Sequence, residues 1–164
     1  MSQDNKEWLT VTSSTLTLQT LPLQEADSHK QFALERPEIA HFLHEHLEEY
    51  GDSLADIERC LDYAASSAEG KGGSIVLAKD GDTITGAVVF NDTGMQGYIP
   101  EHMLVYIAVH RDYRGQGLGK KLLAKALKTV PGSIALHVEA DNPARYLYEK
   151  LGFETKYLEM RLGR

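Results

Sequence analysis

Residues 106–120, YIAVHRDYRGQGLGK, decide the fold of this chain. They begin as an apolar strand, pass through a loop with three glycines in five residues, and continue with helical periodicity. Glycines let the backbone turn tightly and bring several N–H groups against one anion, and a helix start adds unpaired amides and a positive dipole end. Because Arg114 and Lys120 also flank the loop with positive charge, the segment predicts a binding site for a diphosphate-bearing cofactor.

The glycine spacing excludes two common nucleotide-binding loops. A dinucleotide fold needs Gly-x-Gly-x-x-Gly in its first strand–helix turn, whereas this loop reads Gly-x-Gly-x-Gly and lies late in the chain. No Lys-Ser or Lys-Thr pair ends it, as a nucleotide-binding P-loop requires. The pattern Arg/Gln-x-x-Gly-x-Gly/Ala after a strand instead resembles the acetyl-CoA signature of the GNAT superfamily of N-acetyltransferases. Arg114, Gly117 and Gly119 fill its fixed positions.

A second motif strengthens this resemblance. Residues 141–153, DNPARYLYEKLGF, are similar to the family's other hallmark helix, and residues 157–162 are similar to its last strand. The matches cover residues 73–162, whereas residues 1–72 fit only by pattern. The chain is therefore identified as a member of the GNAT superfamily. This resemblance implies an α/β domain with the GNAT (acyl-CoA N-acyltransferase) fold, in which helices flank a mixed central sheet whose strands 4 and 5 splay apart.

Hydrophobic periodicity and turn residues place the individual elements. We expect residues 1–14 to be a flexible N-terminal tail and residues 15–164 to form a single GNAT acetyltransferase domain. Pro37 and Ser53 mark two helix starts, and Asn142 is expected to cap the last helix. The expected strands are 15–21, 74–79, 83–91, 102–109 and 133–139, and the expected helices are 23–34, 37–51, 53–69, 117–130 and 143–151.

The composition narrows the possible functions. The 164 residues carry a formal net charge of −7, and no apolar run reaches the roughly 18 residues that a membrane span needs. One cysteine, Cys60, and the lack of a signal-peptide pattern lead us to expect a cytoplasmic protein without a membrane partner. Residues 1–70 contain 14 acidic and four basic side chains, whereas residues 71–164 contain 10 acidic and 13 basic ones. With no extended basic face, nucleic acid is not an expected partner, and a monomer or a homodimer both remain open.

The resemblance implies where acetyl-CoA, the expected co-substrate, would bind. In the family, the pantetheine arm lies in the gap between strands 4 and 5. Here the main chain of Ile107 and Val109 would pair with it, and the N–H of Val109 or of a close neighbour would polarise the thioester carbonyl. In the family, the asparagine that matches Asn142 also approaches this arm. The expected cofactor-binding residues are therefore Ile107, Val109, Arg114, Gly115, Gln116, Gly117, Leu118, Gly119, Lys120 and Asn142.

Tyr148 is the expected general acid. The thiolate that leaves acetyl-CoA has a conjugate acid with a pKa near 8.5, so a tyrosine with a pKa near 10 can protonate it. Spacing alone favours a core role, because Ala144, Leu147, Tyr148 and Leu151 form one helical stripe. The match to the family's Leu-Tyr-Glu-Lys segment favours the catalytic role.

The general base is less well defined. Several family members carry a glutamate on the fourth strand, about six residues before the position of Val109. Met103 occupies that position here, so the chain departs from the pattern. The neighbouring residues Glu101 and His102 are the candidates, and a water chain without a dedicated base is an equal alternative.

The chain also carries a group of histidines and acids at residues 41–49. They lack the His-Glu-x-x-His order of a helical zinc site, and acetyl transfer needs no metal, so no metal is expected. The resemblance implies direct, sequential transfer of the acetyl group from acetyl-CoA to a primary amine on a small molecule, protein or peptide. The acidic first half hints at a cationic acceptor. The alternative is a non-catalytic CoA-binding regulatory module, which would keep the loop but lack a working acid–base pair.

Overall fold

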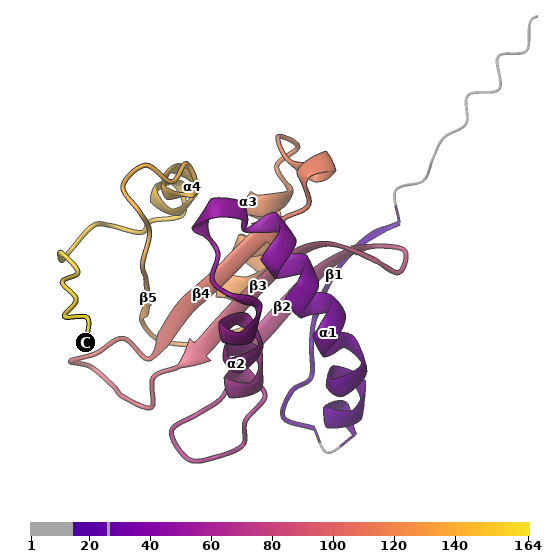
Figure 1. Cartoon of the computed structure of the whole chain (residues 1–164), viewed down its shortest axis with the longest axis horizontal. Helices are drawn as coiled ribbons and strands as arrows, with labels where there is room; N and C mark the ends of the chain where they lie inside the picture. Colours follow the sequence, from indigo (N-terminus) through magenta and orange to yellow (C-terminus); the bar gives the residue numbers. More distant parts are fainter. Residues whose placement is uncertain (1–14, 26) are drawn as a thin grey trace, which may run out of the picture.

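The computed structural model describes residues 15–25 and 27–164, so the predicted tail at residues 1–14 lies outside the described residues. Within them, five strands form one sheet in the order β1-β2-β3-β4-β5 (Figure 1). The strands are β1 (Leu16–Thr20), β2 (Gly73–Asp80), β3 (Thr83–Asp92), β4 (His102–Val109) and β5 (Ile134–Leu136). Neighbours from β1 to β4 are antiparallel, and β5 joins β4 in parallel, which confirms the predicted mixed sheet.

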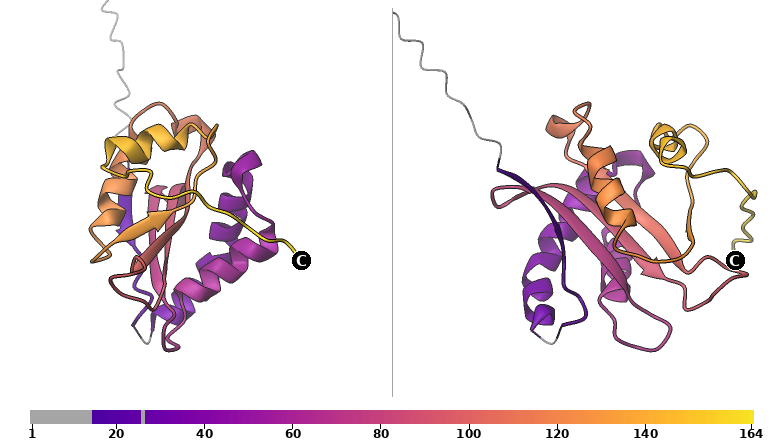
Figure 2. Two further views of the ribbon diagram at one scale, coloured as in Figure 1. Left: turned by 90° about the vertical axis from the view of Figure 1, so that its left-hand side faces the viewer. Right: turned by 180° about the vertical axis from the view of Figure 1, so that it is seen from behind.

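Helices cover both faces of this sheet. They are α1 (Ser28–His46), η1 (Glu48–Tyr50), α2 (Leu54–Ala64), η2 (Arg111–Tyr113), α3 (Leu118–Leu127) and α4 (Ala144–Lys150). Seen edge-on, the sheet separates α1 and α2 from α3 and α4 (Figure 2, left). No helix within residues 15–25 and 27–164 is long and apolar enough to cross a membrane.

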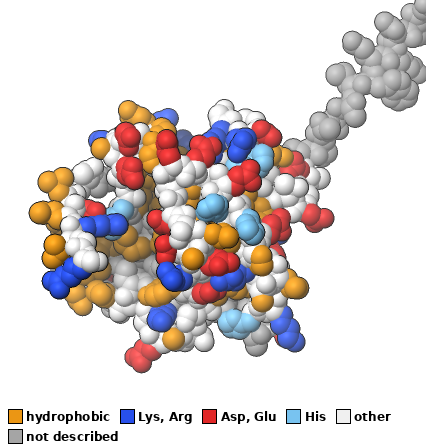
Figure 3. Space-filling view, in the orientation of Figure 1, with side chains coloured by type: hydrophobic (Ala, Val, Ile, Leu, Met, Phe, Trp, Pro, Cys, Tyr) orange, Lys and Arg blue, Asp and Glu red, His pale blue; other side chains and the backbone are white. Residues whose placement is uncertain are grey.

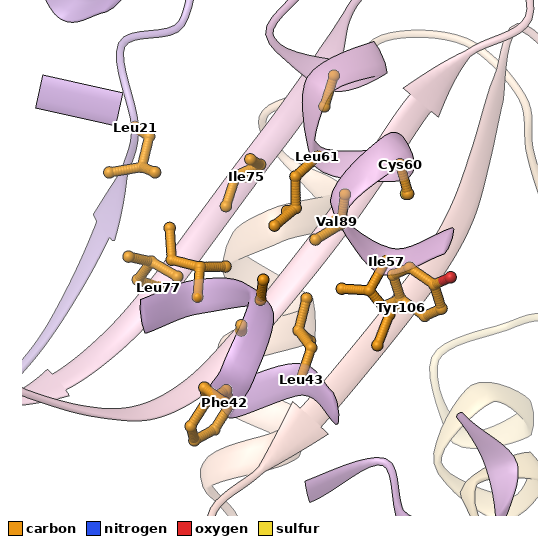
Figure 4. Packing of buried hydrophobic residues seen from close by; sticks show 14 of the residues in the cluster. Leu21, Phe42, Leu43, Ile57, Cys60, Leu61, Ile75, Leu77, Val89 and Tyr106 are labelled. Atoms are coloured by element: carbon orange, nitrogen blue, oxygen red, sulfur yellow. The ribbon is translucent and has the colours of Figure 1, made fainter. Parts of the chain in front are cut away.

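Two hydrophobic clusters hold these layers together. The first packs α1 and α2 against the sheet and includes the fully buried Leu43, Ile57 and Leu77 (Figure 4). The second packs α3 and α4 against the opposite face, where Phe90 and Leu122 are fully buried. Full burial of one such side chain contributes roughly 1.5–3 kcal/mol, so the two clusters fix the sheet from which the site is built.

β4 and β5 form a fork, as the resemblance to the GNAT family implied. They pair over three residues only, ending at Leu104 and Leu136, and the chain after β5 diverges from β4 toward α4 (Figure 1). The β3–β4 register shifts between Val89 and Phe90, which leaves Val105 of β4 as an extra residue. Such a bulge bends a strand and increases its twist. The part of β4 beyond Leu104 therefore has an open edge, and we call this edge and the diverging chain after β5 the fork.

The N-terminal helices differ from the prediction. Residues 23–34 and 37–51 were expected as two helices, but α1 runs unbroken through Pro37. Proline removes one helical hydrogen bond and leaves the carbonyl four residues earlier, that of Ala33, without its partner. Both Pro37 and Ala33 lie on the exposed side of α1, where water can take the place of the lost bond, while the opposite side stays buried through Leu43.

The expected last strand at residues 157–162 does not form. Residues 154–164 adopt neither helix nor strand, and four of their apolar side chains are 79–93% exposed: Tyr157, Leu158, Met160 and Leu162. Figure 3 shows apolar side chains exposed along the edge where this segment lies. A typical strand pairs over five or six residues, and β5 offers only three at this end of the sheet. The strand expected at residues 133–139 is limited to β5, because the chain diverges from β4 after Leu136. The helix expected at residues 53–69 ends at Ala64.

Candidate active site

The loop between β4 and α3 presents a row of free amides. Gly115 and Gly117 adopt φ angles of 73° and 79°, in the left-handed region that favours glycine, and Gly117 is the N-cap of α3. Among the described residues, no acceptor is bonded to the main-chain N–H of any residue from 115 to 120, and the first bond at this end of α3 runs from Lys121 N to Gly117 O. These amides and the helix dipole together suit an anion.

This loop lies directly at the fork. A Cβ atom built on Gly119 would lie 3.6 Å from Val109 Cγ2 and 3.6 Å from Leu147 Cδ2. The start of α3, the end of β4 and α4 therefore meet at Gly119. An anion bound by the loop would lie beside the open edge of β4.

The main chain of β4 points polar groups into the fork. His110 N donates to Thr85 O of β3 at 2.8 Å. Because successive amides of a strand point to opposite edges, the amides of Val109 and Ile107 point to the open edge. The carbonyl of Val109 faces the same side, where it accepts from Arg114 Nε at 3.0 Å. The open edge thus presents main-chain N–H donors with which an extended ligand could pair.

Other expected loop residues place their side chains away from the free amides. The guanidinium of Arg114 donates to Val109 O, to His46 O at 2.8 Å and to Glu48 Oε1 at 3.1 Å. Gln116 Nε2 turns back to Asp112 O at 3.2 Å. Leu118 is buried in the second cluster, and Lys120 is exposed beside the amides. A ligand on this loop would therefore meet mainly backbone N–H groups and Lys120.

Tyr148 combines a buried ring with an unpaired hydroxyl. Its side chain lies in the second cluster, 9% exposed, and its ring packs edge-on against Phe153 at a centroid distance of 5.9 Å. Burial raises the pKa of Tyr148 to about 12. Burial is the one cause of this shift, and no hydrogen bond to the hydroxyl occurs among the described residues. The phenol therefore stays protonated at physiological pH and can donate a hydrogen bond, and its neighbour Leu147 contacts the position of Gly119.

Asn142 holds the start of α4. Its Oδ1 accepts from Ala144 N at 2.9 Å, which satisfies an amide that the helix leaves unpaired. The helix begins one residue later than expected, after Pro143, but Asn142 makes the capping bond that the sequence predicted.

His102 and Glu101, the two expected bases, are committed elsewhere. His102 Nδ1 lies 2.8 Å from Asp92 Oδ1 and its Nε2 lies 2.5 Å from Pro131 O, so both ring nitrogens already have partners within the protein. Glu101 Oε2 accepts from Ser133 N at 2.7 Å, and backbone hydrogen bonds of this kind lower its pKa. Both side chains lie at the end where β4 and β5 pair, away from the open edge of β4. Their assignment as the general base stays a prediction, which these hydrogen bonds weigh against.

Four other residues with polar side chains lie at the fork: Tyr50, Asp52, Tyr106 and His137. Tyr106 Oη donates to Asp52 Oδ2 at 2.6 Å, and Figure 4 shows the Tyr106 hydroxyl directed away from the core. Tyr50 Oη donates to Asp141 O at 3.4 Å. His137 is exposed and directly follows β5, where the pairing with β4 has ended. Sequence reasoning missed Tyr50 and Asp52, because they read as ordinary turn residues until the fold brings them to β4 and α4.

Comparison with known proteins agrees with this geometry. Residues 71–155 match the family model described as acetyltransferase (GNAT) domain. N-alpha-acetyltransferase 30 of Schizosaccharomyces pombe is 33% identical over 82 residues, which are 47% of this chain and 55% of that protein. The cysteine-rich protein 2-binding protein of Mus musculus is 30% identical over 102 residues, 62% of this chain and 12% of that protein. The chain thus spans only part of these curated relatives.

Two solved structures share the fold. The aminoglycoside N-acetyltransferase AAC(6')-Iy in complex with CoA superposes with a TM-score of 0.65 at 15% identity, covering 95% of this chain and 99% of that chain. The NatC complex bound to Gag peptide and CoA gives a TM-score of 0.63 at 20% identity, covering 87% and 86%. At these identities the likeness concerns the fold.

Proposed function

This chain belongs to the acetyltransferase (GNAT) domain family, and from that premise we propose that it transfers the acetyl group of acetyl-CoA directly to a primary amine held at the fork. One observation carries the proposal. The free amides of residues 115–120 lie beside the open edge of β4. A binding site for the diphosphate therefore adjoins a strand edge to which the pantetheine arm could bind.

The main chain would provide most of the contacts to acetyl-CoA. The loop amides would bind the diphosphate, with Lys120 adding positive charge, and the amides of Ile107 and Val109 would pair with the pantetheine arm. An N–H that polarises the thioester carbonyl is commonly worth about 3–4 kcal/mol of transition-state stabilisation. Arg114 would act by fixing the loop and the end of β4, because its guanidinium is bonded to Val109 O.

Tyr148 would stabilise the leaving sulfur. The pKa of this phenol is about 12, whereas the thiol of CoA has a pKa near 8.5. Proton transfer from the phenol to the leaving thiolate would therefore cost about 5 kcal/mol. We therefore assign Tyr148 the role of a hydrogen-bond donor that strengthens as negative charge develops on sulfur. Its hydroxyl is free for this bond among the described residues.

His137 replaces His102 and Glu101 as our proposed base. It is the first residue after the last β4–β5 pair and its side chain is exposed, so it lies where an amine could enter the fork. Imidazole is the side chain most often used as a general base, and an alkylamine must lose a proton before it can attack the thioester.

The acceptor would be an amine that carries positive charge. The exposed Asp52 lies at the open edge of β4 through its bond to Tyr106, and acidic and histidine side chains populate the face of α1 and α2 (Figure 3). The similar proteins include an N-alpha-acetyltransferase and an aminoglycoside N-acetyltransferase, so both peptide and small-molecule amines are candidates. We further propose a cytoplasmic location, because Cys60, the one cysteine of the sequence, is a free thiol, as is usual in a reducing compartment.

A screen for CoA release tests this function. Acetyl-CoA would be incubated with the protein and a polyamine, an aminoglycoside or an unacetylated peptide, and the free thiol would be measured together with the product mass. We expect release and an acetylated product with at least one amine. Binding of acetyl-CoA without release for every class would instead indicate a CoA-binding regulatory module.

A further inference from the structure

Arg114 opens the diphosphate loop, yet its guanidinium points to the C-terminal end of α1. Nη2 donates to His46 O at 2.8 Å, Nη1 to Glu48 Oε1 at 3.1 Å and Nε to Val109 O at 3.0 Å. A cation at the end of a helix interacts favourably with its last carbonyls and its dipole. One side chain therefore joins the loop, the end of β4 and the end of α1.

Glu48 is held in an unusual backbone conformation. Its φ of 55° is the only positive φ of a non-glycine residue in the described part of the chain. Side chains other than those of glycine, asparagine and aspartate rarely adopt this region, and such residues persist only where the surrounding structure fixes them. The bond from Arg114 to the Glu48 carboxylate supplies such a constraint and sets the direction in which the chain leaves α1.

The chain that follows crosses the fork. We call residues 47–53 the crossing segment. Tyr50 Oη donates to Asp141 O between β5 and α4, and Asp52 Oδ2 accepts from Tyr106 Oη of β4 at 2.6 Å. The segment is thus bonded to both sides of the fork, and it connects α1 to α2 on the face opposite α3 (Figure 1).

We propose that Arg114 and Glu48 couple the diphosphate loop to the crossing segment, which makes Glu48 a positioning residue for the acceptor. This inference rests on the proposed function. A diphosphate on the amides of residues 115–120 would fix the loop and therefore the backbone of Arg114. Arg114 would then hold Glu48, and Glu48 would hold Tyr50 and Asp52 across the fork. Because such coupling is reciprocal, an acceptor bound against the crossing segment would also tighten the hold on CoA.

Hydrogen exchange measured by mass spectrometry, with CoA alone as the probe, tests this coupling. In the wild-type chain, saturating CoA should slow amide exchange both at residues 115–120 and in the crossing segment. Glu48→Ala should keep the first protection, keep its CoA affinity and lose the second. Glu48→Gln retains an oxygen that can accept from Arg114 and should restore part of the protection.

Glu45→Gln is the matched control. Glu45 makes a comparable exposed ion pair, 3.4 Å from Arg111 Nη2, between α1 and η2, but it lies outside the crossing segment. This variant should show the wild-type protection at both places.

Two results would overturn the coupling while leaving the proposed function intact. One is CoA protection at residues 115–120 with unchanged exchange in the wild-type crossing segment. The other is full protection of that segment in Glu48→Ala. A lack of protection at residues 115–120 in the wild-type chain would count against the proposed function itself, and with it against the coupling.

Discussion

Tyr148 is buried like a core residue, and we propose that its hydroxyl also takes part in catalysis. Its ring fills the second cluster, whereas its hydroxyl has no partner among the described residues. Tyr148→Phe should therefore leave the fold and the CoA affinity nearly unchanged and lower kcat by about 10² to 10³, the usual cost of removing one hydrogen-bond donor to developing charge. Steady-state kinetics, CoA titration and thermal unfolding check these three quantities. A variant with wild-type kcat would return Tyr148 to a purely structural role.

His137 at the fork and His102 at the paired end of β4 and β5 should respond differently to substitution. His137→Asn should lower kcat by about 10² or more, because an exposed group at the fork is removed. His102→Asn should retain kcat per folded molecule but lower the free energy of unfolding by about 1–3 kcal/mol, since His102 is buried and bonded to Asp92 and Pro131. Kinetics and denaturant unfolding of both variants distinguish the roles. A large loss of kcat only in His102→Asn would contradict our assignment of the base.

His46 makes stability depend on pH. Burial, followed by the nearby His110, lowers the pKa of His46, and its Nδ1 has no partner among the described residues. The unfolded chain, with a histidine pKa near 6.5, binds more protons, so stability is retained above that pH and falls as pH drops below it. His46→Phe should remove part of this acid-side loss, while His44→Gln, exposed on the same helix, should keep it. Denaturant midpoints from pH 8 to pH 5 give the measurement, and identical pH profiles for His46→Phe and wild type would refute the assignment.

At the scale of elements, local patterns predicted the middle of the chain, from β2 to the start of α3. β4 has the predicted bounds, and α3 begins one residue after the predicted Gly117. The hairpin of β2 and β3 turns at Gly81, whose φ of 60° suits the predicted glycine turn. Each of these features depends on neighbouring residues, since strand alternation, turn glycines and helix starts are all local signals.

What the sequence could not predict depends on distant contacts. Pro37 reads as a helix start, but packing of α1 on the sheet overrides that signal. Glu101 and His102 are candidate bases in the sequence, but the sequence does not show that they bond to Ser133 and Pro131. Arg114 reads as a phosphate ligand, yet two of its partners, His46 of α1 and Glu48 of η1, lie more than 60 residues earlier. Such pairings arise only when the fold brings the elements together.

The start of α3 offers a test at this scale. Gly119 lies in the first turn of α3, and an added Cβ would make only ordinary contacts at 3.6 Å. Gly119→Ala should therefore raise the free energy of unfolding by about 0.5–1 kcal/mol and keep CoA binding. Gly117→Ala should lower it by about 1–2 kcal/mol, because φ of 79° is costly for alanine. Chemical unfolding with and without CoA measures both. Equal effects of the two changes would contradict the described loop.

At the scale of the whole molecule, the sheet separates the residues proposed to bind the cofactor from those proposed to bind the acceptor. The loop and Tyr148 lie with α3 and α4, whereas Asp52 and the crossing segment lie with α1 and α2. The acidic side chains are concentrated in residues 1–70 and the positive excess lies in residues 71–164. A polyanionic cofactor and a cationic acceptor would thus be drawn to opposite faces and meet at the fork.

The most direct test of this account is thermal unfolding of the whole chain with and without acetyl-CoA, for wild type and Gly117→Asp. Acetyl-CoA at 100 times its Kd should stabilise the wild type by about 2.7 kcal/mol, a rise of several degrees in Tm. Aspartate tolerates a positive φ better than most residues, so Gly117→Asp should still fold, but its carboxylate beside the free amides should abolish the rise. A wild-type Tm that saturating acetyl-CoA leaves unchanged, or an equal rise in Gly117→Asp, would contradict the claim that the loop amides hold the diphosphate.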